Sequence, residues 1–279
     1  MRVVELSDPA EFLERAAPLL LEDEARHNLI LGIAGTVRDH PTLYAEYELW
    51  LVEEAGSAVA AALRTPPYNL VLGNGTPAGL DALARGIGGS IPGAVGAVPE
   101  IDAFVAACAA AHGITPAPRV QQGIYALDEV VWPPRPVGQP RPAGAADRDL
   151  LVRWWGEFGR ESLGALETDA EQDARNVDQR LSSPTAGIEL WDVGGEPVSV
   201  VAYGSPTPTG IRIGPVYTPG EHRNRGYASA LTAHVSAARL AAGRSFCFLY
   251  TDLGNPTSNR IYAAIGYRRV CDSIQYAFV

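Results

Sequence analysis

Residues 223–228, Arg-Asn-Arg-Gly-Tyr-Ala, have the composition of an anion-binding loop. They follow a strand-like run at 211–217 and lie where a helix is expected to begin, near Arg225. The free N–H groups and the dipole of a helix N-terminus favour a phosphate. Gly226 lets the backbone approach a ligand closely, and Asn224 tolerates a left-handed conformation. The stretch predicts a pyrophosphate loop, although an ordinary strand-to-helix turn is the other interpretation.

A second polar group lies on one face of a predicted helix. Asn255, Asn259 and Tyr262 are spaced by four and three residues, so they share that face and could line a cleft. Asn255 can cap the helix, and Pro256 suits its first position. A core tyrosine with a satisfied hydroxyl is the alternative interpretation of Tyr262.

The strand before the anion loop contains Gly214 and Pro215. Proline cannot donate a hydrogen bond to a sheet ladder, so we expect this strand to bulge or to part from a neighbour there. A strand that parts from its neighbour leaves room for a ligand beside the loop.

Hydrophobic periodicity predicts the same order of elements in both halves of the chain. Each half is expected to contain two helices, a set of antiparallel strands and then β-α-β-α-β, which indicates a duplication. The first half is expected to have helices at 8–20, 22–33, 77–85 and 99–111 and strands at 45–53, 58–63, 69–72 and 120–127. The second is expected to have helices at 147–158, 168–181, 225–242 and 256–265 and strands at 188–193, 197–203, 211–217, 245–251 and 269–278. Five prolines between residues 132 and 142 predict an extended linker.

Charge is unevenly distributed along the 279 residues. All 22 basic residues are arginines, and 32 acidic residues bring the net charge to −10. This balance disfavours nucleic-acid and anionic-membrane partners. Residues 198–279, however, contain 8 arginines against 3 acidic residues, or +5, whereas 1–130 sum to −10 and 131–197 to −5. The cationic final segment favours an anionic ligand, and a solvated arginine surface is the alternative.

The three cysteines, Cys108, Cys247 and Cys271, are far apart and have apolar neighbours. We expect them to be buried free thiols, and the scattered histidines give little support for a metal site. The N-terminus becomes acidic too early for a signal peptide, and no apolar run reaches the ~20 residues of a spanning helix. These features predict a cytoplasmic protein.

Residues 140–279 resemble the GCN5-related N-acetyltransferase (GNAT) superfamily. In that family the pattern Arg/Gln-x-x-Gly-x-Gly/Ala follows the fourth strand, and Arg223, Gly226 and Ala228 occupy its positions. Asn224 stands where a glycine is common. The resemblance implies an α/β (α+β) fold with a mixed, mostly antiparallel sheet flanked by helices, in two tandem GNAT-like domains. We expect a degenerate N-terminal domain at 1–130, a linker at 131–142 and a catalytic domain at 143–279.

The resemblance also implies an activity: transfer of the acetyl group of acetyl-CoA to a primary amine of a small molecule or peptide, by direct attack in a ternary complex. Tyr262 would be the acid that protonates the departing thiolate, and a backbone N–H near Val216 or Tyr217 would polarise the thioester. A monomer or homodimer without a metal is expected. The implied cofactor-binding residues are Val216, Tyr217, Thr218, Arg223, Asn224, Arg225, Gly226, Tyr227, Ala228, Ser229, Asn255, Asn259 and Tyr262.

The general base is less evident, because no Asp or Glu occurs between Pro197 and Gly220. The family architecture places the acidic helical region over the acceptor site, and that region offers Glu157, Glu161, Glu167 and Asp169. We favour Glu161, with a water relay as the alternative.

Two other functions fit parts of the sequence. A non-catalytic acyl-CoA-binding or sensor module would need no base. A nucleotide-dependent oxidoreductase could use Gly73 and Gly75, which follow a strand as in a dinucleotide fingerprint. Thr76 and Pro77, however, explain that turn as the cap and first residue of a helix. We therefore favour the acetyltransferase.

Overall fold

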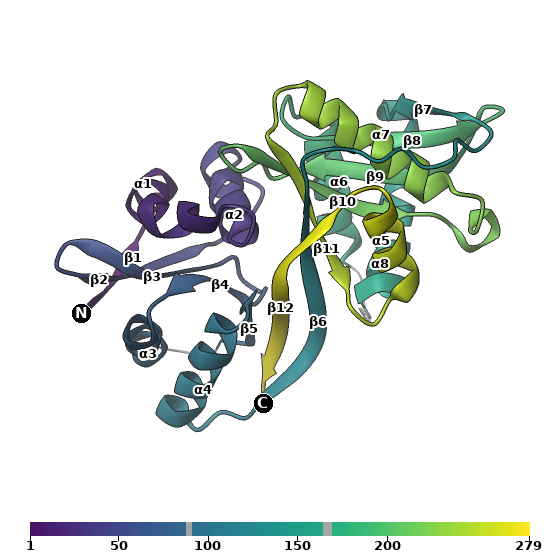
Figure 1. Ribbon diagram of the computed structural model, residues 1–279. Helices are drawn as coiled ribbons and strands as arrows, with labels where there is room; N and C mark the ends of the chain where they lie inside the picture. Colours follow the sequence, from purple (N-terminus) through teal and green to yellow (C-terminus); the bar gives the residue numbers. More distant parts are fainter. Residues whose placement is uncertain (88–90, 164–168) are drawn as a thin grey trace. The chain divides into compact units, whose positions relative to one another are not determined.

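The computed structural model describes residues 1–87, 91–163 and 169–279 (Figure 1). The chain divides into two compact units, and neither is a continuous stretch of sequence. The first contains residues 1–124, 250–254 and 269–279, and the second contains 125–249 and 255–268. Within the described ranges, no helix is long and apolar enough to cross a membrane.

The two halves of the chain carry the same series of elements, as the periodicity predicted. The first half has β1 (Arg2–Leu6), α1 (Pro9–Leu20), α2 (Asn28–Asp39), β2 (Glu48–Glu54), β3 (Ser57–Arg64), β4 (Leu70–Gly75), α3 (Pro77–Gly86), β5 (Gly93–Ala97), α4 (Glu100–His112) and β6 (Pro116–Leu127). The second has β7 (Gln139–Pro142), α5 (Arg148–Leu163), α6 (Ala170–Ser182), β8 (Gly187–Val193), β9 (Glu196–Gly204), β10 (Gly210–Tyr217), α7 (Tyr227–Ala241), β11 (Phe246–Asp252), α8 (Pro256–Ala264) and β12 (Arg268–Phe278). Single 3₁₀ turns are η1 (Leu21–Asp23), η2 (Ala145–Asp147) and η3 (Gly220–His222).

Strand pairing follows one scheme in both units. The first unit has the order β1-β2-β3-β4-β5-β12, in which only β4 and β5 are parallel. The second has the order β7-β8-β9-β10-β11, in which only β10 and β11 are parallel. The predicted class, mixed and mostly antiparallel sheet flanked by helices, is confirmed.

The cap predicted at Thr76 is confirmed, and Asp8 caps the first helix in the same way. The Asp8 carboxylate accepts from the N–H of Ala10 at the start of α1, and Thr76 Oγ1 accepts from Gly79 at the start of α3. The predicted second helix at 22–33 is wrong in position, because η1 intervenes and α2 begins only at Asn28. Strands β1 and β5 were not predicted, and residues 139–142 of the predicted linker form the edge strand β7.

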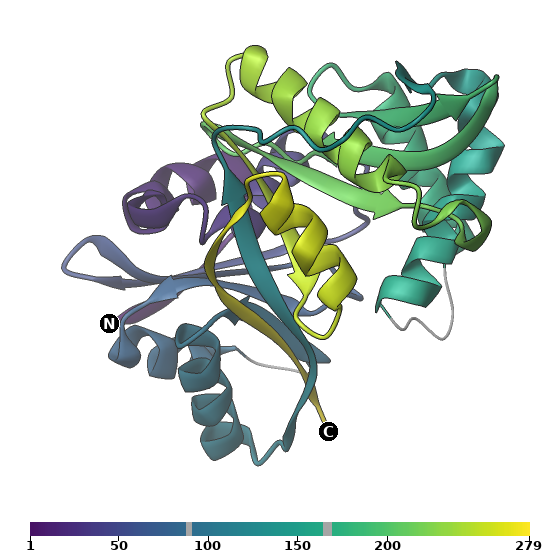
Figure 2. The same cartoon turned by 45° about the vertical axis from the view of Figure 1, so that its right-hand side comes forward.

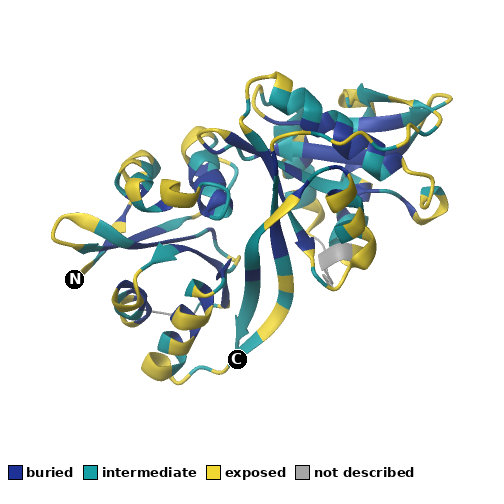
Figure 3. Cartoon of the chain, in the orientation of Figure 1, coloured by how far each residue is buried: buried dark blue, intermediate teal, exposed yellow. Residues whose placement is uncertain are grey.

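The strands of the second unit are largely buried (Figure 3), and their successive residues belong alternately to two core clusters. In the second unit, Ile188 and Leu190 of β8 pack with α5 and α6, whereas Trp191 packs with α7 and α8. The period of two along a strand produces this division. Helices α5 and α6 therefore cover one face of that sheet and α7 covers the other (Figure 2).

The last strand of the chain belongs to the first unit. Residues 273–277 of β12 pair antiparallel with residues 93–97 of β5. The boundaries of the two units therefore differ from the predicted boundaries at residues 130 and 143. The reason is that a terminal strand can pair with any compatible edge of a sheet, and its own sequence does not determine which edge. Cys271 of this strand is only half-buried, so the expectation of three buried thiols holds for Cys108 and Cys247 alone.

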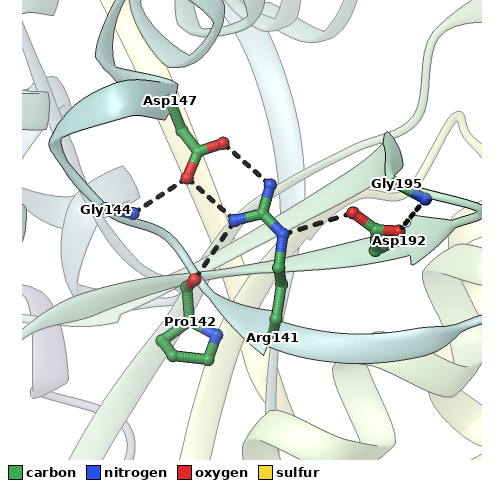
Figure 4. A network of polar contacts seen from close by, with 6 residues as sticks. All are labelled: Arg141, Pro142, Gly144, Asp147, Asp192 and Gly195. Atoms are coloured by element: carbon green, nitrogen blue, oxygen red, sulfur yellow. Dashed lines mark hydrogen bonds and ion pairs between the residues drawn. The ribbon is translucent and has the colours of Figure 1, made fainter.

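A polar network joins β7 to the rest of the second unit (Figure 4). The Arg141 guanidinium donates two 2.8 Å hydrogen bonds to the two oxygens of Asp147, and its Nε donates to Asp192 at 3.3 Å. Asp147 also accepts from the N–H of Gly144, and Asp192 from that of Gly195. Arg141 holds the pKa of Asp147 below its usual 3.8. The network attaches the proline-rich segment to β8 and to the start of α5.

Replacing this arginine should destabilise the fold. Because Asp147 and Asp192 are only 13% exposed, Arg141→Gln should lower the free energy of unfolding by about 1–2 kcal/mol near neutral pH. The contribution through Asp147 is present above its unfolded pKa and is lost as the pH falls through its lower folded pKa, so the difference should shrink towards about pH 2. Urea unfolding at both pH values measures it.

The exposed pair of Arg148 and Asp178 is the matched control. Its side chains are 42% and 51% exposed, so water screens the pair and Arg148→Gln should cost less than Arg141→Gln. Equal losses in the two variants would contradict a structural role for the Arg141 network.

Candidate functional site

A cavity of about 650 Å³ lies in the second unit, where β10 ends and α7 and α8 begin. Its wall combines the predicted anion loop with one face of α8. The lining residues are Glu161, Val216, Tyr217, Thr218, His222, Arg223, Asn224, Arg225, Gly226, Tyr227, Ala228, Ser229, Asn255, Thr257, Ser258, Arg260, Ile261 and Tyr262. The cavity brings together all the predicted site residues except Asn259, which is outside the lining.

Strand β10 separates from its parallel neighbour beside this cavity. The β10–β11 register covers three pairs, from Gly210 with Phe246 to Arg212 with Phe248, while the strands continue to Tyr217 and Asp252. The β9–β10 register shifts between Ile213 and Val216, around Gly214 and Pro215. The predicted bulge is therefore confirmed. Val216 and Tyr217, at the end of β10 beyond this register, line the cavity.

The start of α7 presents backbone amides to the same cavity. Gly226 is the residue before the helix, with φ +82°, and Asn224 has φ +61°, so both take the left-handed conformation that their residue types tolerate. None of the described side chains caps this helix start, and Ala230 makes the first backbone bond, to Gly226 O, at 3.0 Å. A Cβ built on Gly226 would meet no atom within 4 Å. The amides of Tyr227, Ala228 and Ser229 can therefore bind an anion.

The corresponding helix start in the first unit is closed. At α3, Thr76 Oγ1 accepts from the Gly79 N–H at 3.1 Å, and Pro77 supplies no N–H. A Cβ on Gly75 would lie 2.5 Å from a side-chain carbon of Leu80. The chain's own side chains therefore occupy the place where a phosphate would bind, so neither the dinucleotide reading of Gly73 and Gly75 nor a second anion loop is supported.

The end of the cavity at Glu161 contains an ion pair that joins two predicted site residues. Arg223 pairs with Glu161 through Nη2, and its Nε donates to the carbonyl of Thr218 at 2.8 Å. The hydroxyl of Tyr217 lies 2.9 Å from Glu161 Oε1 and 3.1 Å from Glu157 Oε2, and its single proton can serve only one of them at a time. The Arg223 hydrogen bond lowers the pKa of Glu161 below its usual 4.5. Glu161 is thus ionised near neutral pH, and it is a weaker base than an unpaired carboxylate.

Asp169, another acidic candidate, does not line the cavity. Asp169 caps α6 by accepting from the N–H groups of Glu171 and Gln172 at 3.0 Å. Glu167 and the predicted helix start at Thr168 lie outside the described residues. His222, which was not considered from the sequence, lines the cavity, and its buried Nδ1 has no hydrogen-bond partner among the described residues. Its position directly before Arg223 was the signal that could have identified it.

The polar face of α8 provides a helix cap and part of the cavity wall. Asn255 Oδ1 accepts from the Ser258 N–H at 3.1 Å, so it caps the helix as well as lining the cavity. Tyr262 is 9% exposed, and its ring contacts that of Tyr267 edge-on with 6.0 Å between centroids. Burial raises the pKa of Tyr262 to about 12, so its hydroxyl keeps its proton at neutral pH. Burial likewise raises the pKa of Cys247 to about 12, which disfavours a thiolate nucleophile there.

Comparisons with known proteins agree with this geometry. Residues 196–276 match the family described as FR47-like protein. Three similar solved structures are an acetyltransferase of the GNAT family from Colwellia psychrerythraea (11% identity, 100% of both chains, TM-score 0.62), a Drosophila protein (15%, 99% and 98%, 0.71) and a tandem GNAT protein from the clavulanic acid biosynthesis pathway (12%, 100% and 98%, 0.56). This chain has the GNAT fold. The predicted resemblance is thereby confirmed, and a search of the curated proteins found no match.

The GNAT fold implies coenzyme A, and the described residues fit it. The uncapped amides of α7 suit the pyrophosphate, and the open space at Gly226 admits it. Arg223 and Arg225 bring positive charge to the same loop. The same cavity continues along the end of β10 at Val216 and Tyr217, which suits an extended arm. Two independent features, one electrostatic and one steric, thus favour the same ligand.

The charge of Arg223 should control the ionisation of Glu161. Arg223→Gln removes the hydrogen bond and the charge that favour the carboxylate, so the pKa of Glu161 should rise towards 4.5. Carboxyl ¹³C NMR titration measures this change. Arg160→Gln is the control and should move the pKa less, because Arg160 acts only through its charge. An unchanged pKa in Arg223→Gln would contradict the ion pair.

The loop assignment predicts a large effect of a side chain at Gly226. Gly226→Val should weaken CoA binding by at least about tenfold, because a branched Cβ strains the left-handed conformation and occupies the backbone surface that faces the phosphate. Calorimetric titration with CoA measures the affinity. Gly243→Val is the control, since Gly243 also has positive φ (+96°) and open surroundings but follows the other end of α7. Equal affinities in the two variants would refute the loop.

Proposed function

We propose that this chain is an acetyl-CoA-dependent N-acetyltransferase whose second unit binds CoA and transfers the acetyl group to a primary amine. The observation that carries the proposal is one cavity that combines an uncapped, glycine-preceded helix start with the end of β10, whose register with β11 stops at Arg212. The first feature recognises an anion and the second admits an extended thioester arm. The FR47-like match over residues 196–276 covers both.

When bound, acetyl-CoA supplies an acetyl group already activated as a thioester, so the chain needs no nucleophile of its own. The chain's part is to orient the two reactants and to stabilise charge. The backbone N–H near Val216 or Tyr217, beside the bulge, is the donor that faces the thioester carbonyl. Ser199 holds this strand end in place, because its hydroxyl lies 3.2 Å from the carbonyl O of Tyr217 and 2.8 Å from Thr218 Oγ1.

Tyr262 supplies the proton for the departing thiolate. It lines the cavity from α8, and its buried hydroxyl, with a pKa of about 12, is protonated throughout the neutral range. As the carbon–sulfur bond breaks, negative charge develops on the sulfur, and the phenolic proton would pass to it in the same step. The phenol regains its proton from solvent or from the acceptor's ammonium ion.

Glu161 prepares the acceptor in this proposal. As an ionised carboxylate at the acceptor end, it attracts a cationic amine and takes a proton from it directly or through water. The same ion pair also favours the second candidate, a non-catalytic acyl-CoA-binding or sensor module, because Arg223 already neutralises the favoured base. The partner expected for both candidates is small. For the transferase, that partner is the acceptor, a small molecule or peptide.

Thiol release from acetyl-CoA across a panel of primary amines tests the proposal. At least one amine should release free thiol faster than the no-amine control, and Tyr262→Phe should reduce that turnover about 10²-fold while leaving CoA affinity unchanged. Because the chain contains no lysine, self-acetylation of ε-amino groups cannot contribute to the signal.

The outcomes separate the two candidates. Intact CoA binding without amine-dependent thiol release across aliphatic amines, aromatic amines and peptide N-termini would establish the binding module and refute the enzyme. Full turnover by Tyr262→Phe would leave the transferase in place but remove Tyr262 as the acid.

A further inference from the structure

A second cavity, of about 360 Å³, lies in the same unit but has a different lining. Its wall consists of Trp132, Pro133, Arg135 and Pro140 from the proline-rich segment, Trp191 from β8, and Ala230 and His234 from α7. None of these residues lines the larger cavity. Its volume falls in the range of pockets that hold small molecules, roughly 300–1,000 Å³.

The segment that forms one wall is held in place at both ends. The Val131 N–H donates to the carbonyl of Ile265 at 3.0 Å, and the Trp191 indole N–H donates to the carbonyl of Val137 at 2.9 Å. A Cβ on Gly138 would lie 2.3 Å from the carbonyl O of Asp192, so the backbone packs directly on β8 there. Arg141 anchors the residues that follow (Figure 4). The cavity is thus a built feature with a fixed wall.

The surface of this cavity is apolar and aromatic. Trp191 is buried, and the hydrogen bond to Val137 satisfies its only polar atom. Trp132, in contrast, is 63% exposed, which is unusual for so large an apolar side chain. Pro133 and Pro140 complete the apolar wall. Their rings are rigid, so they lose little conformational entropy when a ligand binds. An exposed indole beside a concave apolar wall offers a stacking surface for a flat ring.

The polar groups of this cavity are basic. The lining contains Arg135 and His234 but no carboxylate. Arg135 has no ion-pair partner among the described residues, whereas many arginines of this acidic chain do. Burial lowers the pKa of His234 below 6.5, and the charges of Arg239 and Arg135 add to this effect, so His234 is neutral at pH 7. The unneutralised charge at the cavity is therefore that of Arg135.

We propose that this cavity binds a small aromatic carboxylate, with its ring on Trp132 and its carboxylate at Arg135. A planar ring satisfies the apolar wall, and a single anionic group matches the single free cation. The occupant is distinct from CoA, which requires the amides at the start of α7. Helix α7 lines the two cavities with different residues. Its N-terminus faces the larger cavity, and the proposed carboxylate site lies on the side of the same helix.

Matched small probes test the proposal. We expect benzoate to bind the full-length protein about tenfold more tightly than benzamide, which has the same ring without the charge. Arg135→Gln should abolish this preference, and Trp132→Ala should weaken both probes, whereas Trp132→Phe should retain them. Tryptophan fluorescence and calorimetry give the affinities, and the ring signals of His234 in ¹H–¹³C NMR spectra identify the site.

Two controls make the outcome decisive. Arg119→Gln, at an exposed position of β6 outside the lining, should leave the preference for benzoate unchanged. Saturating CoA should not displace benzoate. The proposal is overturned if benzoate and benzamide bind equally, if neither binds at millimolar concentration, if Arg135→Gln keeps the preference, or if CoA competes. None of these readouts depends on acetyl transfer, so failure here leaves the proposed enzyme untouched.

Discussion

The separation of β10 from β11 is the constraint on which the candidate site depends. Two parallel strands normally continue their ladder, and the backbone groups between them are then satisfied by each other. Here the register covers three pairs, and the bulge around Gly214 and Pro215 turns the end of β10 away. Ser199 supports that end through Tyr217 and Thr218. The end of β10, the cavity and the uncapped start of α7 therefore occur at one place.

The duplicated units show how one architecture can be open or closed to a ligand. Each unit has two parallel strands that are joined in the sequence by a helix. In the first unit these are β4, α3 and β5, and in the second they are β10, α7 and β11. At α3 a threonine, a proline and Leu80 fill the position, whereas at α7 Gly226 leaves it open. A side-chain oxygen and a bound phosphate satisfy the same backbone donors, so the helix that supplies its own cap has no need of an anion.

The charge of the segment that forms the open site is opposite to that of the chain as a whole. The chain is strongly acidic, yet its final segment is cationic. The Arg223–Glu161 pair joins a residue of that cationic segment to a residue of the acidic segment before it. Arg223 favours the anionic ligand and at the same time lowers the pKa of the nearest carboxylate. In the proposed function, binding of a polyphosphate and activation of an acceptor would therefore depend on the same arginine.

Much of this protein was determined by local sequence. The strand–loop–helix order, the bulge at Pro215 and the caps at Asp8, Thr76 and Asn255 depend on residues close together in the chain, and all were predictable. Tertiary structure alone decided that β12 joins the first unit, that Glu161 pairs with Arg223 from 62 residues away, and that part of the proline-rich segment forms an edge strand and a cavity wall. Pairing partners, ion pairs and cavity walls combine residues distant in sequence, and local propensity contains no information about which distant groups meet.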